Sequence, residues 1–169
     1  MNLYPIPFDF INKNAHLSWC DIKWGYEHNL IGSDVPIKKA ENNVVKGDYT
    51  NPELELSFFM PSKSNHIGPF LKELCSGLEQ EDDPIVKKKW LFIVLSWLWN
   101  NRNDFEDPLA EVEAIYADFD YPCEIESFIR YMPPSDGYDP SAHSQMENIN
   151  HLMSKWERFL EKESALFKR

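Results

Sequence analysis

Carboxylate side chains dominate the segment between Asn103 and Ile129, which contains no Lys, Arg or His. Nine of the 23 residues from 104 to 126 are acidic: Asp104, Glu106, Asp107, Glu111, Glu113, Asp118, Asp120, Glu124 and Glu126. Clustered carboxylates can hold a divalent metal, transfer protons as a general acid and base, or attract a cationic protein. They can also be the solvated face of an ordinary helix. The spacing of the residues has to distinguish these roles.

The spacing gives little support to metal or acid–base chemistry. The segment lacks a D-x-D-x-D-G calcium loop and an E-x-x-H pair. His143, Glu147 and His151 recur every four residues and could bind zinc from one helix face, but three ligands on one helix rarely complete a site, and Lys155 follows in the same row. We therefore predict no catalytic residue, no cofactor and no metal. A metal-dependent hydrolase using the 104–126 carboxylates or this row remains the alternative.

A helix is expected over residues 107–119, because Asp107-Pro108 is a typical helix start. At about 100° per residue, its apolar side chains fall within one arc. These are Leu109, Val112, Ile115, Tyr116 and Phe119. Asp107, Glu111 and Asp118 fall together on the opposite side. The pattern predicts a continuous acidic surface beside a buried apolar stripe.

Aromatic residues near the acidic surface could anchor a bound protein, because a charged field steers encounter while a few aromatic side chains supply affinity. We predict a binding surface for a basic protein, formed by Asp104, Glu106, Asp107, Glu111, Tyr116, Asp118, Asp120, Tyr121 and Tyr131. The carboxylates would steer and pair with Lys or Arg, and the tyrosines would be the hot spots. An ordinary solvated face remains open as an explanation of the same pattern.

The amino-acid composition also favours binding to a basic protein. The 169 residues hold 17 Lys and Arg against 28 Asp and Glu, which gives a formal charge of -11. That charge opposes binding to nucleic acid or to an anionic membrane. The N-terminal sequence MNLYPIPFDF lacks the basic and apolar parts of a secretory signal, so we expect a cytoplasmic protein.

The three cysteines, Cys20, Cys75 and Cys123, are widely separated and odd in number. They suggest neither a disulfide framework nor a zinc site. We expect each cysteine to be a small buried hydrophobe.

The fold is predicted to be built around a helix at residues 83–101. Asp83 is a suitable N-cap, Pro84 suits the first helical position, and every residue from Trp90 to Trp99 except Ser96 is apolar. A helix that is apolar all round is normally surrounded by other helices. Its apolar run of ten residues is too short for the 18 or more that a membrane span needs.

Further helices are expected over residues 18–32, 33–47, 51–60, 67–78 and 141–167, with a short segment at 121–129. In 51–60, the alternation of Leu54, Leu56 and Phe58 would also fit a strand, but Pro52 favours a helix. Loops are expected at 61–66 and 132–140, and the acidic stretch EQEDD occupies 79–83. We predict a single all-α domain over residues 1–169, an irregular or orthogonal bundle of seven or eight helices around the Trp-rich helix.

Three stretches of the chain carry a family resemblance: SWCDIKWGYEHNLI, DPLAEVEAIYADFDYP and FIRYMPP. They are similar to parts of a family of small bacterial proteins catalogued only as a domain of unknown function, and the similarity extends from about Leu17 to Leu160. Such families are often found beside secreted polymorphic toxins. The resemblance therefore implies an immunity protein that neutralises a toxin in the producing cell, and it supplies no catalytic residue.

Together these observations predict a non-enzymatic, acidic binding protein, most plausibly an immunity protein that occupies a basic, nuclease-type toxin domain. The partner would be the C-terminal domain of a secreted toxin. A structural subunit that binds some other cationic protein is a third hypothesis. The sequence leaves open the identity of the partner, the oligomeric state and whether binding covers an active site.

Overall fold

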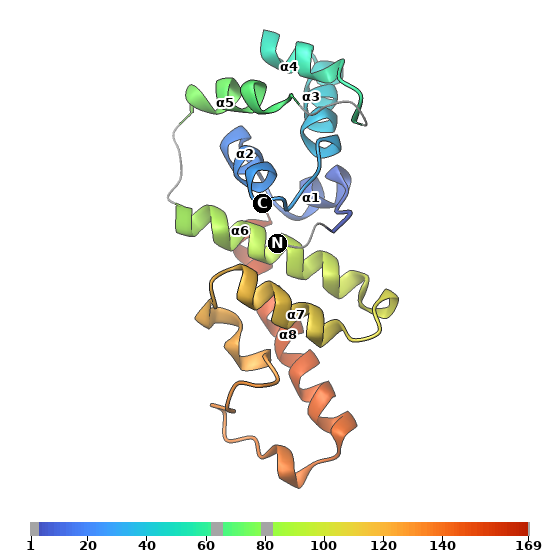
Figure 1. The fold of residues 1–169 in the computed structure, drawn as a ribbon, viewed down its shortest axis with the longest axis vertical. Helices are drawn as coiled ribbons and strands as arrows, with labels where there is room; N and C mark the ends of the chain where they lie inside the picture. Colours follow the sequence, from blue (N-terminus) through green and yellow to red (C-terminus); the bar gives the residue numbers. More distant parts are fainter. Residues whose placement is uncertain (1–3, 62–65, 79–82, 169) are drawn as a thin grey trace. The chain divides into compact units, whose positions relative to one another are not determined.

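The computed structural model describes residues 4–61, 66–78 and 83–168, and within these ranges the regular structure is entirely helical (Figure 1). The predicted all-α fold class is confirmed. The α-helices are α1 (Phe8–Asn14), α2 (Trp19–Glu27), α3 (Asp34–Lys46), α4 (Asn51–Ser57), α5 (Gly68–Ser76), α6 (Asp83–Asn100), α7 (Pro108–Asp118) and α8 (Gln145–Phe167). The described residues also include the short 3-10 helices η2 (Arg102–Asp104), η3 (Cys123–Phe128) and η4 (Pro140–Ala142).

Parts of two predicted segments lie outside the described residues, namely 62–65 of the loop at 61–66 and 79–82 of the acidic stretch at 79–83. Among the residues that are described, no helix combines the length and the apolar character needed to cross a membrane.

The chain divides into two compact units, and the boundary between Val94 and Leu95 falls inside α6. The N-terminal unit comprises residues 1–94 with 168–169, and the C-terminal unit comprises residues 95–167. The single domain expected over the whole chain stays a prediction.

Local capping signals set the start of α2 in the N-terminal unit. Ser18 accepts a hydrogen bond from the Asp21 backbone N–H at 3.2 Å, and the Ser18 backbone N–H donates to the Asp21 carboxylate at 3.0 Å. This is a capping box, and it starts the helix expected from residue 18. Asp21 is only 1% exposed, and Lys89 Nζ lies 3.2 Å from its carboxylate. The indole N–H of the fully buried Trp90 donates to the Asp21 carbonyl at 2.9 Å, which ties α2 to α6.

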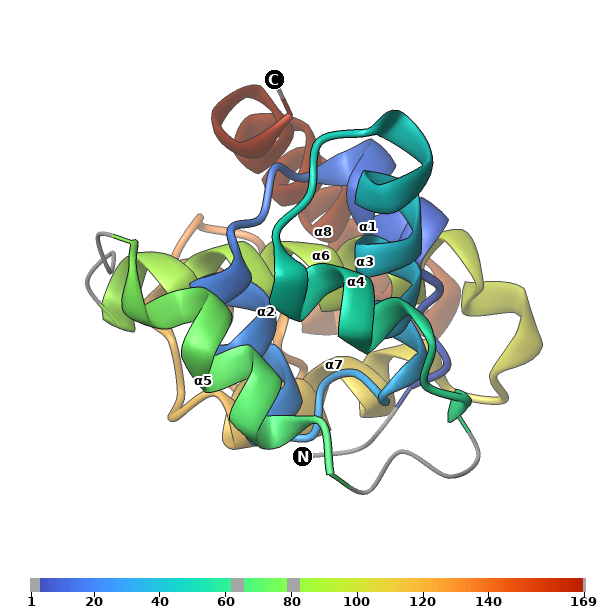
Figure 2. The ribbon, with the colours of Figure 1, turned by 90° about the horizontal axis from the view of Figure 1, so that it is seen from above.

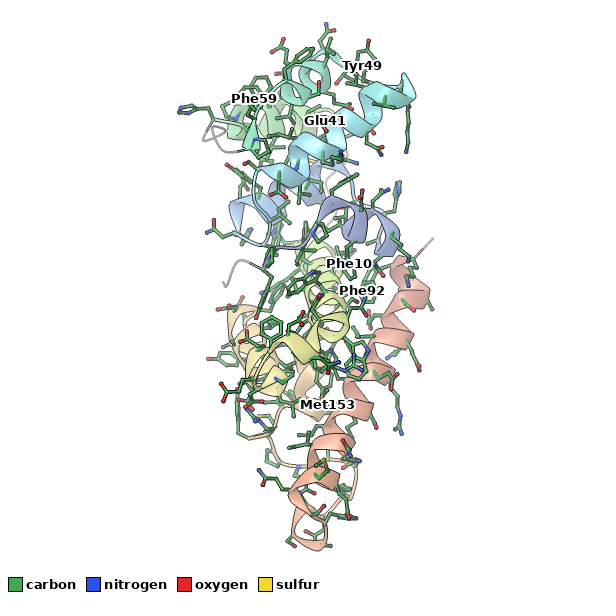
Figure 3. All side chains as sticks on the ribbon, turned by 90° about the vertical axis from the view of Figure 1, so that its right-hand side faces the viewer. Phe10, Glu41, Tyr49, Phe59, Phe92 and Met153 are labelled. Carbon is green, nitrogen blue, oxygen red and sulfur yellow. A yellow bond between two sulfur atoms is a disulfide. The ribbon has the colours of Figure 1, made fainter. Side chains whose placement is uncertain are left out.

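The segment at 51–60 forms a helix rather than a strand, as expected. Pro52 occupies the first turn of α4, and α4 packs against α3. Glu53 links the two helices, since it accepts hydrogen bonds from Asn43 at 2.6 Å and from Thr50 at 3.2 Å. Phe59, which follows α4 and is labelled in Figure 3, meets Phe70 of α5 edge-on at 5.1 Å between ring centroids.

The expectation that all three cysteines are unpaired is wrong. Cys20 of α2 and Cys75 of α5 form a disulfide, with their Cα atoms 4.7 Å apart. The two helices lie side by side (Figure 2), and this packing brings together residues separated by 55 positions in the sequence. Disulfides are typical of proteins in oxidising compartments, whereas the sequence led us to expect a cytoplasmic protein. Cys123 was also expected to be buried, but it is a free, exposed thiol.

The Trp-rich helix is buried as predicted. Every residue of α6 from Trp90 to Leu98 is buried, including Ser96. In the C-terminal unit, Trp99 meets the fully buried Trp156 of α8 edge-on at 5.0 Å, and Phe128 of η3 stacks on the other side of this cluster at 6.4 Å from Trp156. These rings form the core that joins η3 to α8.

The last helix departs from the prediction at its start. It begins at Gln145 rather than near Ser141, because Asp139 caps a separate 3-10 turn and Ser144 caps α8 by accepting a hydrogen bond from the Glu147 backbone N–H at 3.2 Å. The buried apolar side chains of α8 lie only in the second half of the helix. Trp156 and Leu160 are buried, whereas Met146 is 70% exposed.

Candidate protein-binding site

The acidic segment is positioned by η2, α7 and η3. Asp107 caps α7 by accepting a hydrogen bond from the Ala110 backbone N–H at 3.2 Å, and Pro108 opens the helix. The predicted apolar arc is confirmed, since all its members are buried: Leu109, Val112, Ile115, Tyr116 and Phe119. The exposed acidic residues include Asp104, Glu106, Asp120 and Glu124.

One arginine neutralises part of this segment. Arg130 Nε lies 2.8 Å from Glu113 Oε1, Arg130 Nη2 lies 3.3 Å from Glu113 Oε2, and Arg130 Nη1 lies 2.8 Å from Asp107 Oδ2. The hydrogen bond to Glu113, together with the one to Asp107, raises the pKa of Arg130 above its usual value. Partial burial disfavours the Asp107 carboxylate. The hydrogen bond from Arg130, the backbone hydrogen bonds from Ala110 and Leu109 and the positive charge of Arg130 together outweigh this effect and lower the pKa of Asp107.

This contact corrects the predicted role of Asp107, because its carboxylate is already paired within the chain. The negative surface is therefore interrupted at Asp107 and Glu113 rather than continuous. Arg130 is the first cation after the acidic run, so the sequence contained a candidate partner for the carboxylates. The sequence did not show that the fold would bring Arg130 to residues 17 and 23 positions earlier.

Three tyrosines gather where α7 ends. Tyr116 is 3% exposed, and its hydroxyl donates to Glu126 Oε1 at 3.1 Å. Tyr121 and Tyr131 are 59% and 60% exposed, and their rings lie 5.2 Å and 6.3 Å from the Tyr116 ring. Tyr121 and Tyr131 are therefore exposed enough to contact a partner, whereas Tyr116 is buried against their rings. The role of the three tyrosines as anchors stays a prediction. We call these three residues the tyrosine cluster.

Backbone geometry helps to expose Tyr121. Asp120 and Tyr121 both adopt positive φ angles, 59° and 58°, which are uncommon for residues other than glycine. The Tyr121 backbone N–H donates to the Tyr116 carbonyl at 2.8 Å, which closes the turn at the end of α7. Burial, followed by the hydrogen bond to Glu126, raises the pKa of Tyr116. Partial desolvation, followed by the influence of Tyr121 and Glu113, raises the pKa of Tyr131.

The charge of the chain is concentrated in the C-terminal unit. Residues 95–167 hold 15 Asp and Glu against 5 Lys and Arg, a net charge of -10. The N-terminal unit holds 13 acidic against 12 basic residues, a net charge of -1. The tyrosine cluster therefore lies in the part of the chain with the strongest negative field, and this concentration favours encounter with a cationic molecule.

The proposed metal row does not form. His143 lies before α8, where its ring stacks on Tyr138 at 4.5 Å between centroids. His151 Nε2 lies 2.9 Å from Asp136 Oδ2, and Lys155 Nζ lies 2.6 Å from the same oxygen. Within the described ranges, no group of three or more His, Cys, Asp or Glu is arranged to hold a metal ion. The hydrolase alternative therefore gains no support from the geometry.

Sequence reasoning missed the network that fixes the loop before α8. The Tyr138 ring stacks on His151 at 3.8 Å, and its hydroxyl donates to Asn148 at 2.8 Å. The hydrogen bond from Lys155, supported by the one from His151, holds the pKa of Asp136 well below its ordinary value. A loop was expected at 132–140, but no local signal showed that it would pair with α8.

Comparison with known families now adds to this geometry. Residues 8–164 match the family model described as "Uncharacterized protein conserved in bacteria (DUF2247)". The chain belongs to the DUF2247 family. This match confirms the resemblance to a bacterial family of unknown function and assigns no activity. No curated protein and no solved structure matched this DUF2247 member.

Proposed function

We propose that this DUF2247 protein is a non-enzymatic binding protein that captures a basic protein through the tyrosine cluster and the carboxylates around it. The proposal rests on one observation: two exposed tyrosines lie in a unit whose net charge is -10. Exposed tyrosines held by a buried neighbour lose little conformational freedom on binding, which makes them good anchors.

Most of the predicted contact residues keep their role in this proposal. Asp104, Glu106, Glu111, Asp118 and Asp120 would contribute to the negative field that steers the Lys and Arg side chains of the partner. Tyr121 and Tyr131 would be the hot spots. Asp107 would contribute to the field while paired with Arg130, and Tyr116 would position the exposed rings.

The partner would be a toxin domain, and the protein would act as the immunity protein of the producing cell. The acidic character of the C-terminal unit supports this choice, because a cationic nuclease domain is complementary to it. The test is co-expression with the C-terminal domain of a secreted protein encoded immediately upstream. Protection of growth is expected, and a toxic domain that the chain neither binds nor neutralises would contradict the proposal.

The surface is tested with matched variants of the same purified complex. Tyr121→Ala and Tyr131→Ala are each expected to weaken binding at least tenfold, mainly through faster dissociation. Tyr49→Ala is the control, because Tyr49 is also exposed (45%) but lies in the nearly neutral N-terminal unit. Binding should also weaken with added salt, mainly through slower association. Equal affinities for all three variants would contradict this surface assignment.

A further inference from the structure

A hollow of about 270 Å³ lies within the C-terminal unit, between the chain that follows η3 and the first half of α8. Figure 1 shows this connection leaving η3 and returning to the start of α8. Aliphatic side chains from both segments line the hollow: Ile129, Met132, Pro133, Pro134, Ile149 and Leu152. Ile149 is 38% exposed, so the hollow is open to a binding partner.

Several polar side chains that line the hollow already have hydrogen-bond partners within the chain. Asp136 accepts from both His151 and Lys155, and the Tyr138 hydroxyl donates to Asn148. Arg130 also lines the hollow, but its guanidinium pairs with Glu113 and Asp107. Polar groups that already satisfy each other offer little to a polar ligand, so the aliphatic side chains provide the main contact surface.

The hollow adjoins the tyrosine cluster through residues 129–132. Ile129, Arg130 and Met132 line the hollow, while Tyr131 between them contacts the ring of Tyr116. A molecule bound over the exposed tyrosines would therefore meet the edge of the hollow.

We propose that the hollow is a socket for one large apolar side chain of the basic partner, flanked in that partner by Lys or Arg. This inference rests on the proposed function and names the chemistry of the segment that is recognised. Charge complementarity selects the occupant, since the socket lies in a unit of net charge -10. The two cations that line it, Arg130 and Lys155, are already paired with the carboxylates of Glu113, Asp107 and Asp136. Its volume is below the roughly 300–1,000 Å³ of typical small-molecule pockets, which suits a single side chain.

The test uses two synthetic peptides, Lys-Lys-Trp-Lys-Lys and the same peptide with Gly in place of Trp. Binding to the full-length chain is followed by NMR through the methyl signals of Met132, Ile149 and Leu152. The Trp peptide is expected to shift these signals and to bind at least tenfold more tightly than the Gly peptide. Equal affinities, or shifts confined to residues outside the hollow, would overturn the socket.

Matched variants keep the test independent of folding. Ile149→Gln is expected to weaken binding of the Trp peptide about tenfold. Met146→Gln should leave this affinity unchanged, because Met146 is exposed on the same helix but does not line the hollow. If the uncharged peptide Ser-Ser-Trp-Ser-Ser binds with the same affinity as Lys-Lys-Trp-Lys-Lys, the hollow does not select a basic segment and the proposal is wrong.

The socket and the proposed function can fail separately. If the upstream-encoded toxin domain binds and Ile149→Gln does not weaken that complex, the socket is wrong while the function stands. If that domain does not bind at all, but the Trp peptide binds at the three methyl groups, the function is wrong while the socket stands as a site for basic, apolar segments.

Discussion

The two units of the chain are stabilised in different ways. The N-terminal unit has nearly balanced charge and is cross-linked by the disulfide between α2 and α5. The C-terminal unit carries a net charge of -10 and is held by stacked aromatic rings and by a few arginine and lysine contacts. Uncompensated charge destabilises a compact state through self-repulsion. A unit that keeps it therefore has a reason other than stability, and binding a cationic partner would be such a reason.

The largest effect is expected from the disulfide of the N-terminal unit. Replacing both Cys20 and Cys75 by Ser should lower the free energy of unfolding of the oxidised protein by about 4 kcal/mol, because the cross-link closes a loop of 55 residues. Urea unfolding with and without a reducing agent measures the change, and hydrogen exchange locates it.

Cys123→Ser is the control, because this exposed thiol is free and its removal should leave unfolding unchanged. If reduction affects the C-terminal unit as much as the N-terminal unit, the two units do not differ in the way described above.

A smaller effect is expected where α2 packs on α6. A Cβ atom at Gly25 would lie 2.3 Å from Cζ2 of the Trp90 ring, which is fully buried. Gly25→Ala should therefore cost about 1–3 kcal/mol of stability through overpacking. Thermal unfolding followed by Trp fluorescence measures it.

Gly68→Ala provides the comparison within the same unit, because no atom lies within 4 Å of the added Cβ there. Gly68→Ala should therefore leave the free energy of unfolding almost unchanged. Equal losses in the two variants would show that close packing of Gly25 against Trp90 does not determine the stability of this unit.

The smallest effect is expected from the ion pairs of the C-terminal unit. Arg130→Gln removes the contacts to Glu113 and Asp107, and the loss should be about 0.5–1 kcal/mol because the side chains are partly exposed. The loss should shrink at high salt, since screening weakens the repulsion among the remaining carboxylates. Urea unfolding at two salt concentrations measures both quantities.

Arg158→Gln is the matched control, as Arg158 is an exposed cation of the same unit, on α8. If its effect equals that of Arg130→Gln, the loss reports the net charge of the unit rather than the specific contacts of Arg130.

Local signals in the sequence predicted much of the fold. Ser18 with Asp21 and Asp107 with Pro108 start α2 and α7 as expected, because a cap and its backbone donor lie within three residues of each other. The start of α8 was also readable, since Ser144 and Glu147 have the spacing of a capping box. The prediction instead started the helix near Ser141, and the only buried residues of α8 are Trp156 and Leu160.

The candidate site was only partly predictable. The buried arc of α7 follows from helical periodicity. On the opposite side Asp107 is exposed, whereas Glu111 and Asp118 are half-buried. The same periodicity placed Tyr116 in the buried arc, which conflicted with its assignment as an exposed anchor. The pairing of Arg130 with residues 17 and 23 positions away depends on how η3 returns beside α7, which no local pattern specifies.

The sequence by itself determined the helical class, most of the helix starts, the buried Trp-rich helix and the acidity of the segment after it. These properties depend on side-chain type and on hydrogen bonds between residues a few positions apart. Only the tertiary structure decided which carboxylates are already neutralised, which tyrosines remain exposed, that Cys20 meets Cys75, and that the loop before α8 encloses a hollow. Each of these depends on distances between segments far apart in the chain, which the packing of the helices sets.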